Sequence, residues 1–211
     1  MDRRIGAAAA IGFVVIGAIE LALTGGPAPA AGETTEAVRF FTDEAGAGPA
    51  VAVLSAVAGT LFFVFTAALT STIPPGPWRM LTWTGAIVIV TLAFAGQAAQ
   101  QTAWIIADDA AETIVGALGG LVGFLFGFAL IGGAVLALAS GIAAFEGADL
   151  PRWLLAIAGV VALVIVAGVA STDVAAAGFP AFLVWLLAAA IALMRPTAEP
   201  AGTTGGSPVH E

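Results

Sequence analysis

The chain has 211 residues, of which 60% are hydrophobic and only 9% are charged. A soluble domain carries about 25% charged residues, so this composition excludes a soluble enzyme and a soluble nucleic-acid-binding domain. The absence of cysteine also excludes disulfides and cysteine-ligated metals. The formal net charge of -8 comes from short segments between long apolar runs, so it describes loops rather than one acidic surface.

Six charge-free runs follow one another along the chain. Each can supply roughly the 20 apolar residues that a helix needs to cross the hydrocarbon layer, the first only if Glu20 is accommodated at its end. The sequence therefore predicts an all-α, polytopic transmembrane bundle with six spanning helices in one domain, residues 1–195. The predicted spans are about 5–24, 49–72, 80–107, 113–145, 151–171 and 180–194. Residues 196–211 are rich in Pro, Gly and Thr and are predicted to form a disordered cytoplasmic tail.

The arginines, which are the only basic residues apart from one histidine, predict the orientation. With a cytoplasmic N-terminus, only Arg39 lies outside. The five arginines on the cytoplasmic side are Arg3, Arg4, Arg79, Arg152 and Arg195. Because short cytoplasmic loops are enriched in basic residues, both termini are predicted to be cytoplasmic, in a multi-pass protein of the cell membrane.

The first apolar run has a second interpretation, a signal peptide cleaved near Ala28-Pro29-Ala30. The run of about 19 residues is longer than the ~7–15 residues usual in such a peptide, which favours a span. In the following loop, Glu36, Arg39 and Asp43 have helical spacing. This segment is either a short helix on the outer leaflet or an irregular loop.

Glu20 is the only acidic residue inside a predicted span. Ionised carboxylates are costly in hydrocarbon, so such a residue often faces a bundle interior or a wet cavity. One interpretation is therefore a proton- or cation-binding group. The other is a carboxylate that reaches the headgroups from near the membrane boundary.

The third predicted span carries the densest polar patch. Gln97, Gln101, Trp104 and Asp108 are separated by four, three and four positions, which places them on one helical face directed toward the outer surface. With Glu20 they form the candidate polar pocket. The alternative is that the glutamines form hydrogen bonds between helices.

The fourth predicted span is glycine-rich. Small residues at spacing four let a neighbouring helix approach closely, and the predicted helix-packing residues are Gly116, Gly119, Gly120, Gly123 and Gly127. The neighbour belongs either to the same chain or to a second copy in a homo-oligomer.

The segment Gly120-Leu121-Val122-Gly123-Phe124-Leu125-Phe126-Gly127, followed by Leu150-Pro151-Arg152-Trp153-Leu154, resembles part of a bacterial membrane-protein family. That family, of the type found in high-GC actinobacteria, consists of uncharacterised six-helix proteins and is known as a domain of unknown function. The resemblance implies the six-helix fold and no activity.

No catalytic residue, metal site or cofactor is predicted, because no zinc motif, phosphate-binding loop or nucleophile-base set can be assembled. We expect contact with the lipid bilayer, no nucleic-acid partner, and a protein that is structural or regulatory through helix packing. The alternative is a small transporter or channel with an outward-facing site lined by Glu20, Gln97 and Gln101, whose small-molecule or ion ligand the sequence leaves open. A membrane-embedded enzyme is disfavoured.

Overall fold

The computed structural model describes residues 2–25, 34–170 and 172–195. Within these ranges the chain is all-α, as the sequence predicts. The helices are α1 (Arg3–Leu23), α2 (Thr34–Asp43), α3 (Gly48–Ser71), α4 (Pro77–Ile106), α5 (Glu112–Phe145), α6 (Trp153–Ala170) and α7 (Thr172–Met194), with a 3₁₀ turn at Ala45–Ala47. The predicted tail and the predicted cleavage site at Ala28-Pro29-Ala30 lie outside the described residues.

Five helical segments are long and apolar enough to cross a membrane: α1, α3, α4, α5 and Ala177–Met194 of α7. The apolar part of α6 is shorter and covers Trp153–Gly168. The last helix differs from expectation, because α7 begins at Thr172 and contains Pro180 instead of starting there. A proline inside a helix removes one backbone hydrogen bond, which a span tolerates when neighbouring helices compensate.

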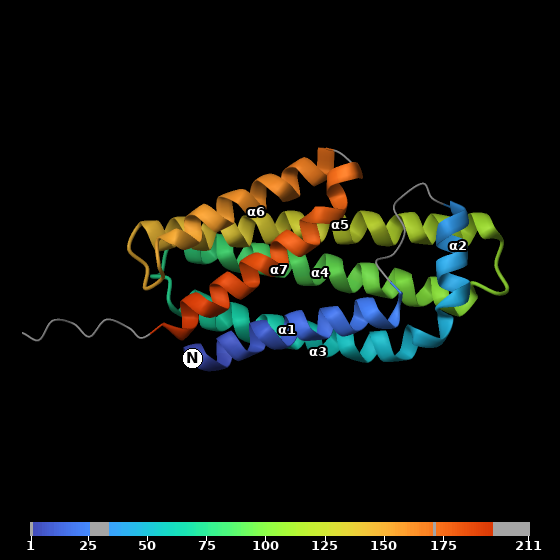
Figure 1. Ribbon diagram of the computed structural model, residues 1–211, viewed down its shortest axis with the longest axis horizontal. Helices are drawn as coiled ribbons and strands as arrows, with labels where there is room; N and C mark the ends of the chain where they lie inside the picture. The colour runs from blue at the N-terminus through green and yellow to red at the C-terminus, as the bar shows by residue number, and fades with distance from the viewer. Residues whose placement is uncertain (1, 26–33, 171, 196–211) are drawn as a thin grey trace, which may run out of the picture.

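The long helices lie side by side, and α2 runs across one end of them (Figure 1). Around the bundle, α1 contacts α3 and α7, α4 contacts α3 and α5, and α6 contacts α5 and α7. The opposite end carries Arg3, the α3–α4 turn, the α5–α6 turn and the end of α7. We call these the α2 end and the terminal end.

Glycines of α5 set how closely its neighbours approach. A Cβ atom added at Gly132 would lie 2.8 Å from the carbonyl oxygen of Gly85 in α4, and one at Gly85 would lie 2.6 Å from the Gly132 oxygen. A Cβ at Gly133 would meet the Phe182 ring of α7 at 3.0 Å, and one at Gly141 would meet Leu155 Cα of α6 at 2.9 Å. Because only glycine leaves room for such contacts, α5 is the helix around which α4, α6 and α7 are arranged.

Two apolar clusters form the interior. The larger lies within the bundle and includes Phe65, Leu136 and Trp185, which are fully buried. The smaller lies beneath α2, where Ala37 and Phe41 contact α4 and α5. The loop segment singled out in the sequence is therefore helical, with its apolar face covering the bundle.

Candidate functional site

Glu20 is half-buried and faces a neighbouring helix. Ser55 Oγ of α3 donates a hydrogen bond of 2.8 Å to Glu20 Oε1 of α1. The carboxylate thus joins two spans near the α2 end. Ser55 is absent from the predicted site, although a serine within an apolar run at a matching depth is a usable signal.

Gln101 also links helices. Its Nε2 donates a hydrogen bond of 2.9 Å to the carbonyl oxygen of Gly48, the first residue of α3. This contact agrees with the interpretation that the glutamines form hydrogen bonds between helices. Asp108 is exposed in the α4–α5 turn.

Trp104 and Gln97 differ from Gln101. Trp104 is buried beneath α2, stacked on Phe40 with ring centroids 6.3 Å apart and edge-on to Phe41 at 6.1 Å. Trp104 Nε1 and Gln97 Nε2 are buried nitrogen atoms with no hydrogen-bond partner among the residues that the structure describes. A buried donor without an acceptor costs about 1–3 kcal/mol, so both are positions where a bound water or ligand would be stabilising.

The predicted pocket residues therefore contact different neighbours. Glu20 and Gln101 each bond to α3, whereas Trp104 packs under α2. Within 2–25, 34–170 and 172–195, no hydrogen bond joins Glu20 to Gln97 or Gln101. Gln97, Gln101 and Trp104 lie on α4, whereas Asp108 lies beyond its last residue, Ile106, and is not part of a helical face. Gln101 bonds to α3 and Trp104 packs under α2.

The predicted packing glycines of α5 are also divided. A Cβ at Gly119 would lie 2.8 Å from Ala37 Cβ, so this glycine seats α2. A Cβ at Gly127 would have no atom within 4 Å. Gly116, Gly120 and Gly123 are half-buried on the same half of α5.

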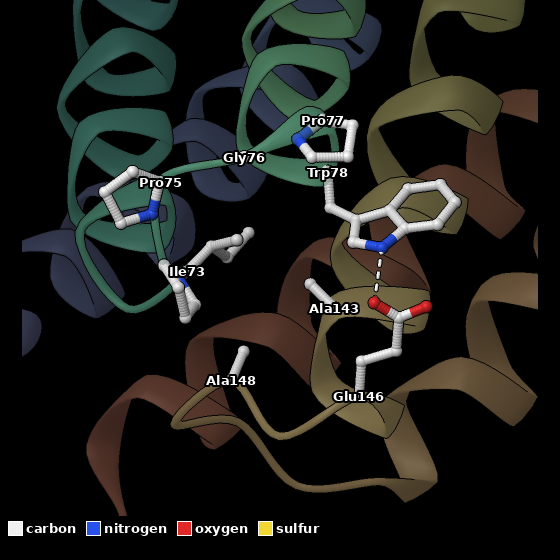
Figure 2. Close-up of a pocket in the computed structure, with 9 residues that line it drawn as sticks. Ile73, Pro75, Gly76, Pro77, Trp78, Ala143, Glu146 and Ala148 are labelled. Atoms are coloured by element: carbon white, nitrogen blue, oxygen red, sulfur yellow. Dashed lines mark hydrogen bonds between the residues drawn. The ribbon is translucent and has the colours of Figure 1, made fainter.

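A pocket that the sequence does not reveal lies at the terminal end. It has a volume of about 270 Å³ and lies between the α3–α4 turn and the end of α5 (Figure 2). Trp78 Nε1 donates a hydrogen bond of 2.6 Å to Glu146 Oε2 across it. The lining residues are Ile73, Pro74, Pro75, Gly76, Pro77, Trp78, Ala143, Glu146 and Ala148.

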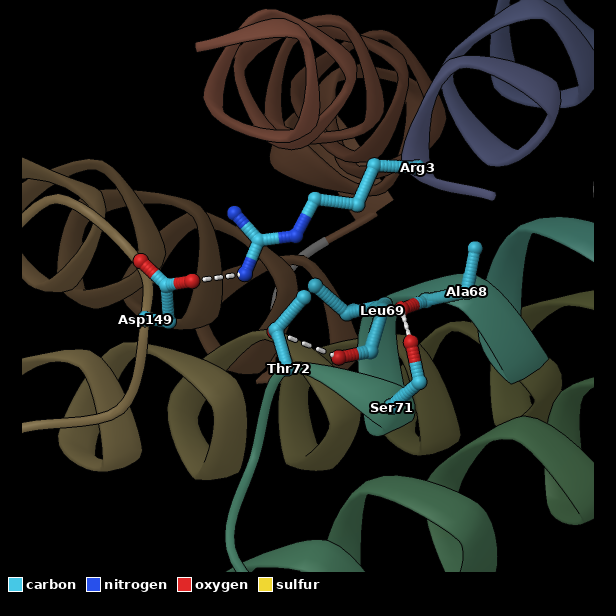
Figure 3. A network of polar contacts seen from close by, with 6 residues as sticks. All are labelled: Arg3, Ala68, Leu69, Ser71, Thr72 and Asp149. Atoms are coloured by element: carbon cyan, nitrogen blue, oxygen red, sulfur yellow. Dashed lines mark hydrogen bonds and ion pairs between the residues drawn. The ribbon is translucent and has the colours of Figure 1, made fainter. Parts of the chain in front are cut away.

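The walls of this pocket are tied together by further contacts. The Asp149 backbone N–H donates to the Thr72 carbonyl oxygen at 3.2 Å, which joins the two turns. The Asp149 carboxylate forms an ion pair with Arg3 of α1 (Figure 3). Gly147, with a φ of 107°, supplies the left-handed backbone that lets the chain turn between Glu146 and Ala148.

Among the described residues, no group of three or more His, Asp or Glu side chains is placed to hold a metal ion. No family model, curated protein or solved structure matches the chain. The fold itself defines a class, an α-helical bundle with helices able to span a membrane. Leu150-Pro151-Arg152-Trp153-Leu154 forms the turn into α6, and the family resemblance that it carries stays a prediction.

Proposed function

We propose that the protein is a six-span integral protein of the cell membrane with both termini cytoplasmic. We further propose a structural or regulatory role, exerted by packing α5 against a second copy of the chain. The apolar helices support membrane insertion. Contacts at the terminal end support the topology, and the surroundings of Gly127 support the packing role.

The topology is supported by contacts that bring the start of α1, the two turns and the end of α7 together at the terminal end. Arg3 pairs with Asp149, the Asp149 N–H bonds to Thr72, and the Arg195 guanidinium lies 5.4 Å from the centre of the Trp153 ring. If α6 also crosses the membrane, the chain crosses it six times, and both termini lie on the same side. Its 18 residues rise about 27 Å, close to the thickness of the hydrocarbon layer.

Cysteine labelling tests this topology without background, because the chain has no native cysteine. We expect Ala110→Cys to react with a membrane-impermeant maleimide from outside. Gly76→Cys and Gly147→Cys should react only after permeabilisation. The reverse pattern, or equal labelling at both ends, contradicts the orientation.

The surroundings of Gly127 support the packing role. Gly119, Gly132, Gly133 and Gly141 each receive a neighbour from the same chain, whereas a Cβ at Gly127 would have no atom of residues 2–25, 34–170 or 172–195 within 4 Å. Beside it, the exposed residues of α5 include Leu121, Phe124 and Phe128. A glycine flanked by large apolar side chains lets a second helix approach closely, which is how helices associate in lipid.

Self-association in vesicles tests the packing role. Gly127→Leu is expected to lower dimerisation by about tenfold or more, because the leucine fills the contact without touching its own chain. Gly159→Leu on α6 is the matched control, since a Cβ at Gly159 also has no atom within 4 Å. Wild-type protein that stays monomeric as the lipid is reduced, or a Gly127→Leu variant that dimerises normally, contradicts the role.

One observation favours the second candidate, a small transporter or channel. Gln97 Nε2 and Trp104 Nε1, which have no hydrogen-bond partner in the described part of the chain, are suited to a ligand with hydrogen-bond acceptors. Under this candidate, Gln97→Leu and Glu20→Gln each alter ion or solute flux in proteoliposomes. Wild-type vesicles without flux of protons, common cations or small neutral solutes contradict it.

A further inference from the structure

The pocket at the terminal end offers mainly hydrogen-bond acceptors along the α3–α4 turn. Proline has no backbone N–H, and three of the four residues from Pro74 to Pro77 are prolines. From Pro74 to Pro77 this turn has an N–H only at Gly76, and the Gly76 carbonyl oxygen accepts a hydrogen bond from the Met80 N–H at 3.2 Å. The carbonyls of Pro74 and Pro75 are the acceptors that remain in the turn before α4. Across the pocket, Glu146 is the only charged side chain among the nine lining residues. This lining suits a ligand that carries a positively charged hydrogen-bond donor.

The other walls are apolar. They are formed by proline rings, Ile73, Ala143 and the indole of Trp78, and the volume of about 270 Å³ approaches the lower end of small-molecule pockets, ~300–1,000 Å³. Quaternary ammonium groups are recognised by cages of several aromatic rings, and this pocket has one ring. A primary ammonium group, which donates hydrogen bonds to a carboxylate, fits the single ring and the single acid better.

One wall of the pocket is the start of α4, since Pro77 and Trp78 are among its lining residues. Trp78 and Arg79 lie in the first turn of α4, and its N-cap residue, Gly76, supplies no side-chain cap. Pro77 has no N–H and the Met80 N–H bonds to the Gly76 carbonyl oxygen, which leaves the backbone N–H groups of Trp78 and Arg79. The first-turn N–H groups and the Arg79 guanidinium are suited to a phosphate. A ligand with an ammonium linked to a phosphate matches both features.

We propose that this pocket binds the headgroup of phosphatidylethanolamine, with the ammonium on Glu146 and the phosphate toward the start of α4. A tryptophan and arginines at the end of a membrane bundle are typical of the headgroup layer, which supports a lipid rather than a soluble ligand. The proposal requires membrane insertion but not self-association through Gly127.

Native mass spectrometry of the full chain in detergent tests this site. Phosphatidylethanolamine and phosphatidylglycerol with identical acyl chains are titrated separately, with free phosphoethanolamine as a soluble competitor. We expect phosphatidylethanolamine to bind about tenfold more tightly than phosphatidylglycerol, as one charge-assisted hydrogen bond provides. Equal binding of the two lipids contradicts the proposal. Displacement of the lipid by an equal concentration of phosphoethanolamine also contradicts it and identifies a soluble ligand.

Two variants separate recognition from folding. Glu146→Gln keeps an acceptor for the Trp78 N–H but removes the charge, so the preference for phosphatidylethanolamine is expected to disappear. Trp78→Phe keeps an aromatic wall and releases the carboxylate, so the preference is expected to persist. Glu112→Gln, an exposed acid at the α2 end, is the matched control and should leave it unchanged. A Glu146→Gln variant that retains the preference overturns the assignment, and Gly127→Leu should retain it whatever its effect on dimerisation.

Discussion

The two halves of α5 use the same small residue for different purposes. Toward the terminal end, Gly132, Gly133 and Gly141 each receive a different helix of the same chain. Toward the α2 end, Gly119 seats α2, and Gly127 faces open space between exposed phenylalanines. Glycines on one helix can therefore serve different contacts, some with helices of the same chain and others, as proposed for Gly127, with a second molecule. Each glycine has to be assigned separately.

The largest effect is expected where α4 and α5 cross. Gly132→Leu places a side chain against the backbone of Gly85 and Ile89, which forces the two helices apart. We expect a loss of about 3 kcal/mol or more in the free energy of unfolding. Unfolding in mixed micelles measures it, and Gly127→Leu should change the same quantity by less than about 0.5 kcal/mol. Equal losses in the two variants would remove the distinction between the halves.

Gly119→Leu is expected to disturb the contact between α5 and α2. The new side chain meets Ala37 and Phe41 of α2, so the cost is expected to be about 1–3 kcal/mol and confined to that helix. Faster protease cleavage within α2 and a changed environment of Trp104 are the measurements. Ala117→Leu, at an exposed position on α5, is the control. An α2 that stays protected in Gly119→Leu contradicts the tight contact.

Ser55→Ala removes the hydrogen bond to Glu20. Interhelical hydrogen bonds in membranes contribute about 0.6 kcal/mol on average, and we expect a destabilisation of that order. Thr60→Ala is a matched control, because the Thr60 hydroxyl donates to the Ala56 carbonyl of its own helix. If Ser55→Ala and Glu20→Gln prove fully additive in a double-mutant cycle, the two side chains do not interact.

The smallest effect concerns the exposed face of α2. Arg39 Nε and Asp43 Oδ2 lie 3.3 Å apart at spacing i, i+4, and both side chains are exposed. Arg39→Ala is expected to cost about 0.3–0.5 kcal/mol at low salt and nothing measurable at 1 M salt. The stability of α2 against proteolysis at the two salt concentrations provides the test. A salt-independent loss would indicate that the arginine contributes by packing instead.

Much of the fold follows from the sequence because apolar runs, turns and periodicity are local signals. The run after Pro49 predicts a span at 49–72 and the structure has α3 at Gly48–Ser71; the spacing of Glu36, Arg39 and Asp43 is compatible with the helix observed as α2. The start of α7 at Thr172 could not be predicted in this way. A proline that opens a helix in isolation lies inside one when neighbouring helices support it.

The contacts of the sites depend on how distant helices meet, which no local pattern encodes. Gln97, Gln101 and Trp104 do share one face of α4, but the sequence does not indicate that Gln101 reaches Gly48 while Trp104 lies under α2. The pocket at the terminal end is not predictable from the sequence for the same reason. Trp78 and Glu146 are 68 positions apart in the sequence, and neither segment by itself indicates a pocket.

The contact between α1 and α7 has a consequence for biosynthesis. Gly6 of the first helix lies in close contact with two other helices: an added Cβ would clash with Ala68 and lie 3.4 Å from Leu193, a residue of the last helix. The ribosome must therefore release almost the whole chain before the first helix acquires its last partner. Until then, the α1 surface that α7 covers must be shielded by lipid or by the insertion machinery.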